Sequence, residues 1–342
     1  MHKITRALPI VEGQSVIFRR RAWLLIRFVL ALGILWGFYV ELFRRNDFDQ
    51  LWQLFRGNLS GATLHYVLFC MLLMPFNWLL ETLKWRQFTQ PWSGMSFGQS
   101  LRAVLAGVAA SMLLPNRSGD YLGRWLLAPE QQKGKIILAT VAGNYCQFLI
   151  LLGLGLPSLL CLGHYAKTWQ ISGIEKFAAP ILLIFLGLLA LGVVGIPQLL
   201  HHYAERNQGL IWKGAWRYVQ TVLDQALEVL QHYRLATFGA GLGLAALRYG
   251  LYSVQYYAIL HFYGIDLPPD AALAGVGTIY LLQTAIPLPP VLGLLARGEI
   301  ALLVWGIWGA NALSTLAASY TLFVLNLVLP ALLGLFFIVK KA

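Results

Sequence analysis

The sequence is poor in charged residues and in cysteine. Only 12% of its 342 residues are charged, whereas 58% are hydrophobic. A soluble protein of this length needs more polar surface, so the composition predicts an all-α polytopic integral membrane protein. The apolar segments are also too long and too continuous for β-barrel strands, in which apolar and polar residues would alternate.

The sequence also lacks the usual motifs of catalytic and metal sites. Its three cysteines, Cys70, Cys146 and Cys161, all lie in apolar segments and indicate neither a disulfide framework nor a metal site. There is no glycine-rich phosphate loop and no nucleophile elbow. We therefore predict no catalytic residues, no metal and no cofactor, although an intramembrane enzyme stays an alternative.

Acidic residues are scarce, since 14 Asp and Glu stand against 26 Lys and Arg, which gives a formal net charge of +12. In a soluble protein that excess would suggest nucleic acid. Here the basic residues cluster at the ends of apolar segments, which favours contact with anionic lipid and excludes a nucleic-acid partner. Residues 263–270 contain Asp266 and Asp270 but no Lys or Arg. This bias predicts that both termini are cytoplasmic.

About six apolar runs approach the roughly 20 residues that a spanning helix needs. They cover about residues 22–43, 64–86, 136–162, 178–200, 236–262 and 315–339. We expect the first run to be an uncleaved span rather than a signal peptide, because it continues to about Leu42. Residues 44–58 are expected to be a loop between the first two spans.

Two further apolar segments, 99–128 and 271–298, are interrupted by helix-breaking prolines, which are Pro115 in the first and Pro287, Pro289 and Pro290 in the second. Proline removes a backbone donor and breaks the helix. Broken backbone at membrane depth is tolerated only where protein buries it or a wet cavity adjoins it. We therefore predict two re-entrant helical hairpins, with kinked full spans as the alternative.

The two interrupted segments resemble each other. Ala106-Gly107-Val108 precedes the first proline break, and Ala274-Gly275-Val276 precedes the second. In each unit a long helix, a broken segment and another long helix follow in the same order. We predict one transmembrane domain over 1–342, with repeat units at 64–200 and 236–339 in opposite orientations, an arrangement typical of transporters.

Residues 210–232 have a different pattern. Apolar residues including Trp212 and Trp216 recur at three- and four-residue steps, and charged or amide side chains fill the other side. This pattern predicts an amphipathic helix on the cytoplasmic interface, because tryptophan suits that depth. A cytoplasmic helix packed on loops is the alternative.

The first broken segment carries a charged motif of Arg117, Asp120 and Arg124, spaced three and four residues apart. On a helix these side chains share one face, so Asp120 can pair with either arginine. A free arginine fork could then bind a phosphate in a bidentate manner. The alternative is an internal salt-bridge cluster that only fixes the hairpin. Gly119 and Gly123 would let another helix approach closely.

Other ionisable residues in apolar surroundings are further candidates for substrate binding, because such groups are expensive in a membrane. They are Glu81, Lys84, Arg248, Arg297 and Glu299. Glu81 and Lys84 can pair at three-residue spacing, although Lys84 can also reach the interface without a function. Arg248 is expected either to contact a phosphate or to pair with Glu299 or a broken-helix carbonyl.

These stretches resemble the lysylphosphatidylglycerol synthase transmembrane-region family, a flippase-like module found at the N-terminus of multiple-peptide-resistance proteins and alone in many bacteria and archaea. The resemblance covers roughly residues 20–340. Its matching stretches are Asn77-Trp78-Leu79-Leu80-Glu81 with Lys84-Trp85-Arg86, Leu114-Pro115-Asn116-Arg117-Ser118-Gly119-Asp120 with Arg124, Ile286-Pro287 with Gly293 and Glu299, and the stretch from Asn326 to Gly334. The second proline motif departs from the family pattern, because Pro289-Pro290-Val291-Leu292 intervenes and Gly298 directly precedes Glu299.

The resemblance implies a transporter of the bacterial inner membrane that translocates an anionic phospholipid or a polyprenyl-phosphate-linked molecule. The aminoacyl-transferase domain of the fused proteins is missing from the sequence, so lipid synthesis is not implied. Two alternatives are an intramembrane enzyme on lipid-linked substrates and a scaffold for an envelope-biogenesis complex. A homo-oligomer or an envelope-enzyme partner is left open.

Overall fold

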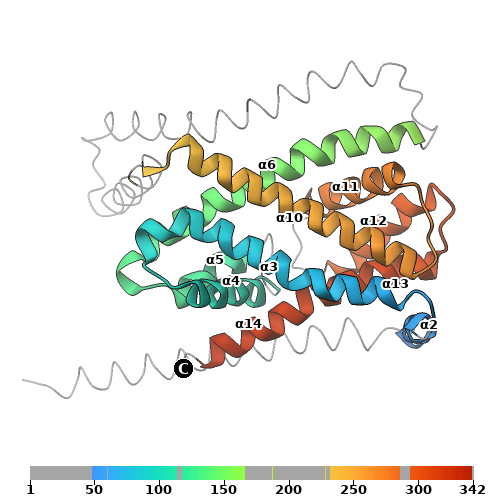
Figure 1. The fold of residues 1–342 in the computed structure, drawn as a ribbon, viewed down its shortest axis with the longest axis horizontal. Coiled ribbons are helices and arrows are strands. Elements are labelled where there is room, and N and C mark those ends of the chain that lie inside the picture. Colours follow the sequence, from blue (N-terminus) through green and yellow to red (C-terminus); the bar gives the residue numbers. More distant parts are fainter. Residues whose placement is uncertain are drawn as a thin grey trace, which may run out of the picture.

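The computed structural model describes residues 48–59, 61–112, 114, 118–165, 187, 228, 232–285 and 293–340. Within these residues every regular secondary-structure element is a helix, and there is no strand (Figure 1). The all-α architecture predicted from composition is therefore confirmed. The predicted spans at 22–43 and 178–200 and the amphipathic helix at 210–232 fall essentially outside the described residues.

Two long helices form the centre of the bundle. They are α3, Leu64–Ser93, and α10, Leu235–Phe262. The two run antiparallel along their whole length, because Gly241 lies against Phe88 near one end and Gln255 bonds to the Cys70 backbone toward the other. Figure 1 shows these two helices side by side across the molecule.

A helical hairpin follows α3. Its arms are α4, Phe97–Ser111, and α5, Ser118–Leu127. Helix α4 begins with a capping box, in which the Ser96 hydroxyl accepts from Gln99 N and the Gln99 side chain accepts from Ser96 N. Both arms have fewer than the roughly 20 residues needed for a span, and they run antiparallel.

Helix α6 follows the first hairpin and covers Lys133–Tyr165, after one 3-10 turn at Glu130–Gln132. The second hairpin consists of α11, Pro269–Ala285, and α12, Leu294–Gly306. Its arms are also antiparallel, because Gly275 faces the Trp305 ring and Arg297 bonds to Gln283. The structure therefore confirms two hairpins, and the alternative of two kinked full spans is wrong.

The last helix is continuous over 312–340, in three parts. These are α13 at Ala312–Phe323, a π-helical turn η4 at Val324–Val328, and α14 at Leu329–Lys340. Pro330 explains the wider turn, since it has no N–H to donate to the carbonyl of Asn326 four residues earlier. The turn places Asn326 against α3.

Each hairpin packs against the long helix that follows the other hairpin. Helix α14 packs antiparallel along α4, and α11 packs antiparallel along α6. In the first pair Gly334 lies against the Leu105 backbone, and in the second Gly155 lies against Gly277 and Leu281. Such close contacts between small residues are typical of membrane helices. The hairpins thus enter from opposite ends, as the inverted arrangement requires, although the unit limits at 64–200 and 236–339 stay a prediction.

Three helical stretches in the described residues are long and apolar enough to cross a membrane, namely 64–93, 130–163 and 312–340. The predicted span at 64–86 therefore continues for about two more turns. Helix α10 has 28 residues and accompanies α3 throughout. The family and these helices identify a membrane protein.

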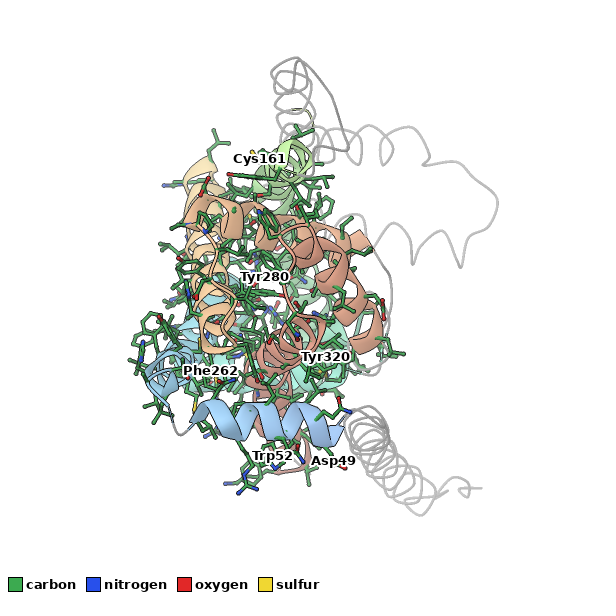
Figure 2. All side chains as sticks on the ribbon, turned by 90° about the vertical axis from the view of Figure 1, so that its right-hand side faces the viewer. Asp49, Trp52, Cys161, Phe262, Tyr280 and Tyr320 are labelled. Carbon is green, nitrogen blue, oxygen red and sulfur yellow. The ribbon has the colours of Figure 1, made fainter. Side chains whose placement is uncertain are left out.

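The predicted loop at 44–58 is wrong in part. Residues Phe48–Leu59 form helix α2, which lies across one end of the bundle (Figures 1 and 2). Its Leu51, Leu54 and Phe55 side chains pack against the core beneath it, whereas Trp52 is 47% exposed. An amphipathic helix in this position is suited to a membrane interface.

The ends of the bundle differ in charge. The end where α3 and α14 finish and α4, α6 and α10 begin, here called the basic end, carries Arg102, Lys133, Lys135, Arg234 and Lys340. It also carries Glu130 and Glu228, which pair with Lys133 and Lys135. The opposite end carries Asp49, Arg56, Asp266 and Asp270.

Candidate functional site

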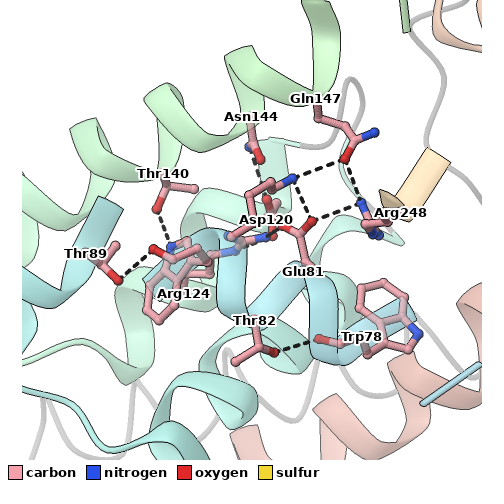
Figure 3. A network of polar contacts seen from close by, with 12 residues as sticks. Trp78, Glu81, Thr82, Thr89, Asp120, Arg124, Thr140, Asn144, Gln147 and Arg248 are labelled. Carbon is pink, nitrogen blue, oxygen red and sulfur yellow. Dashed lines mark hydrogen bonds and ion pairs between the residues drawn. The ribbon is translucent and has the colours of Figure 1, made fainter. Parts of the chain in front are cut away.

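Five ionisable side chains meet in the interior of the bundle and form what we call the charged cluster, which consists of Glu81, Lys84, Asp120, Arg124 and Arg248. Each is buried, with an exposed fraction between 1% and 9%. They come from α3, α5 and α10, which are far apart in sequence (Figure 3). Glu81 and Arg248 lie near the middle of α3 and α10, so the cluster lies near the midplane of the bundle.

Glu81 is the centre of the cluster. Its Oε2 atom is 2.7 Å from Lys84 Nζ and 2.9 Å from Arg248 Nη1, while its Oε1 atom is 2.8 Å from Arg124 Nη2. The predicted pair of Glu81 with Lys84 is therefore confirmed. A single carboxylate holds three cations, which the sequence spacing did not indicate.

Asp120 holds Arg124 from the other side. Arg124 Nε donates to Asp120 Oδ1 at 2.7 Å, and Asn144 Nδ2 of α6 donates to Asp120 Oδ2 at 3.2 Å. The predicted pairing of Asp120 with an arginine four residues later is thus confirmed. Arg124 also stands over the Trp85 ring, with 5.5 Å from its Cζ atom to the ring centroid.

Three glycines bring the hairpin arms together so that these charges can reach α3. A Cβ atom at Gly119 or Gly123 would overlap the backbone of Ala110 or Ala106 on α4. Gly107 faces the Asp120 and Arg124 side chains. The expectation that Gly119 and Gly123 allow close approach of another helix is confirmed, and the helix is the other arm of the same hairpin.

Arg248 pairs with Glu81 and, among the described residues, not with Glu299. The breaks at 115–117 and 286–292 lie outside the described residues, so a contact with a broken-helix carbonyl is untested, and a contact with a phosphate stays a prediction. The Arg248 Nε atom donates to Asn77 Oδ1 at 2.8 Å, and its Cζ atom lies 5.3 Å from the centroid of the Trp78 ring. Asn77 Nδ2 in turn reaches Asn326 Oδ1 in the π-helical turn at 3.5 Å. The last helix is thereby connected to the cluster.

Helix α6 contributes amide groups. Gln147 Oε1 accepts from Lys84 Nζ at 3.3 Å and from Arg248 Nη1 at 3.5 Å (Figure 3). Asn77, Asn144, Gln147 and Asn326 were not among the predicted binding residues. Asn77 and Asn326 lie in the stretches that carry the family resemblance. Asn144 and Gln147 are three residues apart in an apolar helix, a polar pattern that more often indicates hydrogen bonds between helices than a ligand site.

The formal charges of the cluster do not cancel. Among the described residues, three cations, Lys84, Arg124 and Arg248, stand against two carboxylates, Glu81 and Asp120, so one positive charge is left over. An uncompensated buried charge is expensive unless a counter-ion joins it. Arginine is well suited to this task, because its planar guanidinium binds phosphate and carboxylate in a bidentate manner.

The corresponding region of the second half is aromatic rather than charged. The Tyr280 ring lies 6.0 to 6.2 Å from the rings of Tyr249, Tyr252 and Tyr256, measured between centroids. Gly275, whose counterpart Gly107 faces Asp120 and Arg124, faces the Trp305 ring. The two hairpins therefore share a backbone arrangement but not a chemistry.

The structure leaves two predicted binding residues outside the charged cluster. Arg297 is partly buried on α12, where its Nη1 atom donates to Gln283 Oε1 at 2.9 Å and its Cζ atom lies 5.8 Å from the Phe323 ring centroid. Glu299 is exposed, and none of the described residues makes an ion pair with it. Their roles in binding stay a prediction.

The remaining predicted site residues lie outside the described residues. They are Arg117 and the helix-breaking Pro115, Pro287, Pro289 and Pro290. Arg117 directly precedes the first residue of α5, Ser118, and so stays a prediction as a phosphate ligand. In the described part of the chain, no group of three or more His, Cys, Asp or Glu side chains could hold a metal ion.

Comparison with protein families shows where the chain belongs. The family model described as "Lysylphosphatidylglycerol synthase TM region" matches residues 24–334, which is most of the chain. No curated protein and no solved structure matches the chain.

Proposed function

The chain belongs to the lysylphosphatidylglycerol synthase TM-region family, and on that premise we propose that it moves an anionic lipid head group across the bacterial inner membrane. The family supports a function related to membrane lipids. Translocation of the lipid is more specific than the family alone supports. It is supported by the buried charged cluster, in which one positive charge has no counter-charge among the described residues.

The charged head group is the part of the lipid that the bilayer interior opposes. A charged group at the bilayer centre costs about 2.5–3.5 kcal/mol even on scales that allow relaxation. A midplane cluster with a positive charge to spare stabilises an anion at the depth where the bilayer opposes it most. The acyl chains can remain in lipid, so that only the head group needs this polar path.

The arrangement of the helices suggests how the cluster would take up a phosphate. Arg248 and Lys84 both contact the Oε2 atom of Glu81, and Gln147 is a neutral partner of both. A phosphate could therefore exchange with the carboxylate without leaving either cation unpaired. Arg124 remains held by Asp120 meanwhile.

Orientation follows from the charge difference between the two ends. The basic end, with Arg102, Arg234 and Lys340, would face the cytoplasm by the positive-inside rule, and the end of α14 would then be cytoplasmic. A cytoplasmic N-terminus requires in addition the predicted span at 22–43. The proposal requires no chemical step and no cofactor. An energy source is not part of it, because equilibration between leaflets needs none.

Reconstituted liposomes test the proposal. Fluorescent phosphatidylglycerol is placed in both leaflets, and the fraction bleached by external dithionite is followed over time. We expect wild-type protein to make the inner-leaflet pool accessible and Arg248→Gln to slow this at least tenfold. Because that substitution leaves two cations against two carboxylates, the variant should fold. Arg56→Gln on the exposed surface of α2 is the matched control, and wild-type rates equal to those of protein-free liposomes would refute transport.

A further inference from the structure

A pocket lies at the basic end, away from the charged cluster. It has a volume of about 580 Å³ and is formed by the end of α3, the start of α4, the end of α5 and the last turn of α14. Its lining includes Ser93, Gln99, Arg102, Leu127, Phe337 and Lys340. This volume falls within the range of pockets that bind small molecules.

The charge of this pocket is of one sign. Arg102 and Lys340 are both exposed, and no acidic residue lines the pocket. Glu130 follows the lining residue Pro129, but its carboxylate is 2.6 Å from Lys133 Nζ. Among the described residues none makes an ion pair with Arg102 or Lys340. The pocket therefore has two basic groups available for an anion.

The surface beside the pocket is apolar. On α14, Leu333 is 52% exposed and Phe336 is 58% exposed. With Phe337 and Lys340 they follow three- and four-residue spacing, so they share one face of the helix. A ligand with its anionic group at Lys340 could lay an apolar chain along Leu333 and Phe336. This pairing of a basic pocket with an exposed apolar strip fits an amphiphile better than a free anion.

The pocket is also connected with the charged cluster through the first hairpin. Leu127 lies one helical turn beyond Arg124 on α5, and Arg102 lies on α4 between the capping box and Gly107, which faces Arg124. Leu127 is thus on the arm that carries Asp120 and Arg124, and Arg102 is on the arm that packs against them.

We propose that this pocket is a second anionic-lipid site, in which Arg102 and Lys340 bind the phosphate of a phospholipid from the adjoining leaflet before it reaches the charged cluster. The order of the two sites rests on the proposed function, whereas binding of a phospholipid at the pocket does not. The ligand is a phosphate-bearing diacyl lipid, and the two basic side chains distinguish it from a lipid without net charge.

Native mass spectrometry of the detergent-purified protein tests the site with dioleoylphosphatidylglycerol, with dioleoylphosphatidylcholine as the uncharged analogue of equal chain length. The variant is Arg102→Gln/Lys340→Gln. Because each basic residue at an anionic surface contributes about fivefold in affinity, we expect the variant to bind phosphatidylglycerol roughly 25-fold more weakly and phosphatidylcholine unchanged. Lys135→Gln/Arg234→Gln removes the same charge from the basic end without touching the pocket, and this control should bind as wild type.

Two measurements keep the proposal falsifiable. A phosphatidylglycerol with a photoreactive head group should crosslink to peptides containing residues 93–102, 127–129 or 337–340. Crosslinks confined to other peptides, or equal affinity in the pocket and control variants, would overturn the proposal. Displacement of the lipid by millimolar glycerol 3-phosphate would also overturn it, since the site would then bind the free anion.

The binding measurement and the liposome transport assay together separate the two proposals. If wild-type protein moves no lipid but the pocket variant still loses phosphatidylglycerol, the transport proposal fails and the pocket site stands. If Arg248→Gln abolishes transport while the pocket variant transports and binds as wild type, the pocket site fails and the transport proposal stands.

Discussion

Replacement of Glu81 by glutamine should destabilise the protein strongly, although the two side chains have nearly the same volume. Glu81→Gln keeps the volume but removes the only carboxylate that contacts Lys84 and Arg248 among the described residues, with contacts of 2.7 and 2.9 Å. The cluster would then hold three cations against Asp120 alone. Removing one partner of a buried ion pair costs about 3–5 kcal/mol, because an uncompensated charge is left behind.

The assay is the free energy of unfolding in mixed micelles, followed as sodium dodecyl sulfate replaces a mild detergent. We expect Glu81→Gln to lose about 3–5 kcal/mol. The matched control is Glu228→Gln, which removes a carboxylate that is 52% exposed from its pair with Lys135. Because exposed pairs contribute only about 0–1 kcal/mol, this control should change stability little.

A second substitution tests the cause of the loss. Lys84→Met in the Glu81→Gln background restores the single excess charge of the wild type. The double variant should therefore be more stable than the sum of the single losses predicts, by about 0.5–3 kcal/mol of coupling. A Glu81→Gln protein within about 0.5 kcal/mol of wild type, or a double variant with strictly additive losses, would refute the reasoning.

Two further predictions concern packing and pH. Gly123→Leu should destabilise the protein by about 1–3 kcal/mol or prevent folding, because its side chain would overlap the Ala106 backbone. Gly98→Leu is the control and should not destabilise the protein, because there is open space around its Cβ position. Equal yields of monodisperse protein for the two variants on size exclusion would contradict this prediction. At the end of the bundle opposite the basic end, the Tyr165 hydroxyl donates to the Asp270 carboxylate and lowers the pKa of Asp270. The stability that this hydrogen bond contributes is therefore present above the ordinary pKa of aspartate and is lost as the pH falls through the lowered pKa. Tyr165→Phe should raise the pKa of Asp270 in a carbon-13 NMR titration, and an unchanged titration would remove the hydroxyl as the cause.

Much of the first hairpin was predictable because its local signals agree. Pro115, followed by the charged motif, marks the break between the two arms, and Gly119 and Gly123 at four-residue spacing mark a face that another helix can approach. The pairing of Asp120 with Arg124 follows from helix geometry alone. These features depend on neighbours in the chain, and the structure confirms them.

The partner of Arg248 could not be predicted in the same way. Pattern alone offered a phosphate, Glu299 or a backbone carbonyl, but the antiparallel packing of α3 with α10 puts Arg248 beside Glu81, Asn77 and Trp78. A mid-helix charge needs a partner, and the sequence does not say which of several distant carboxylates is near. Glu299 is an acidic residue in an apolar stretch that the fold leaves exposed, and its role in binding stays a prediction.

The sequence by itself determined that this is an all-α membrane protein, where its helices are interrupted, and which ionisable groups needed compensation, since hydropathy, proline and helical spacing act over short distances along the chain. Only the tertiary structure decided that three cations share the Glu81 carboxylate and that one positive charge remains. That charge balance depends on distances between α3, α5, α6 and α10, and these are fixed by the packing of whole helices rather than by any one segment.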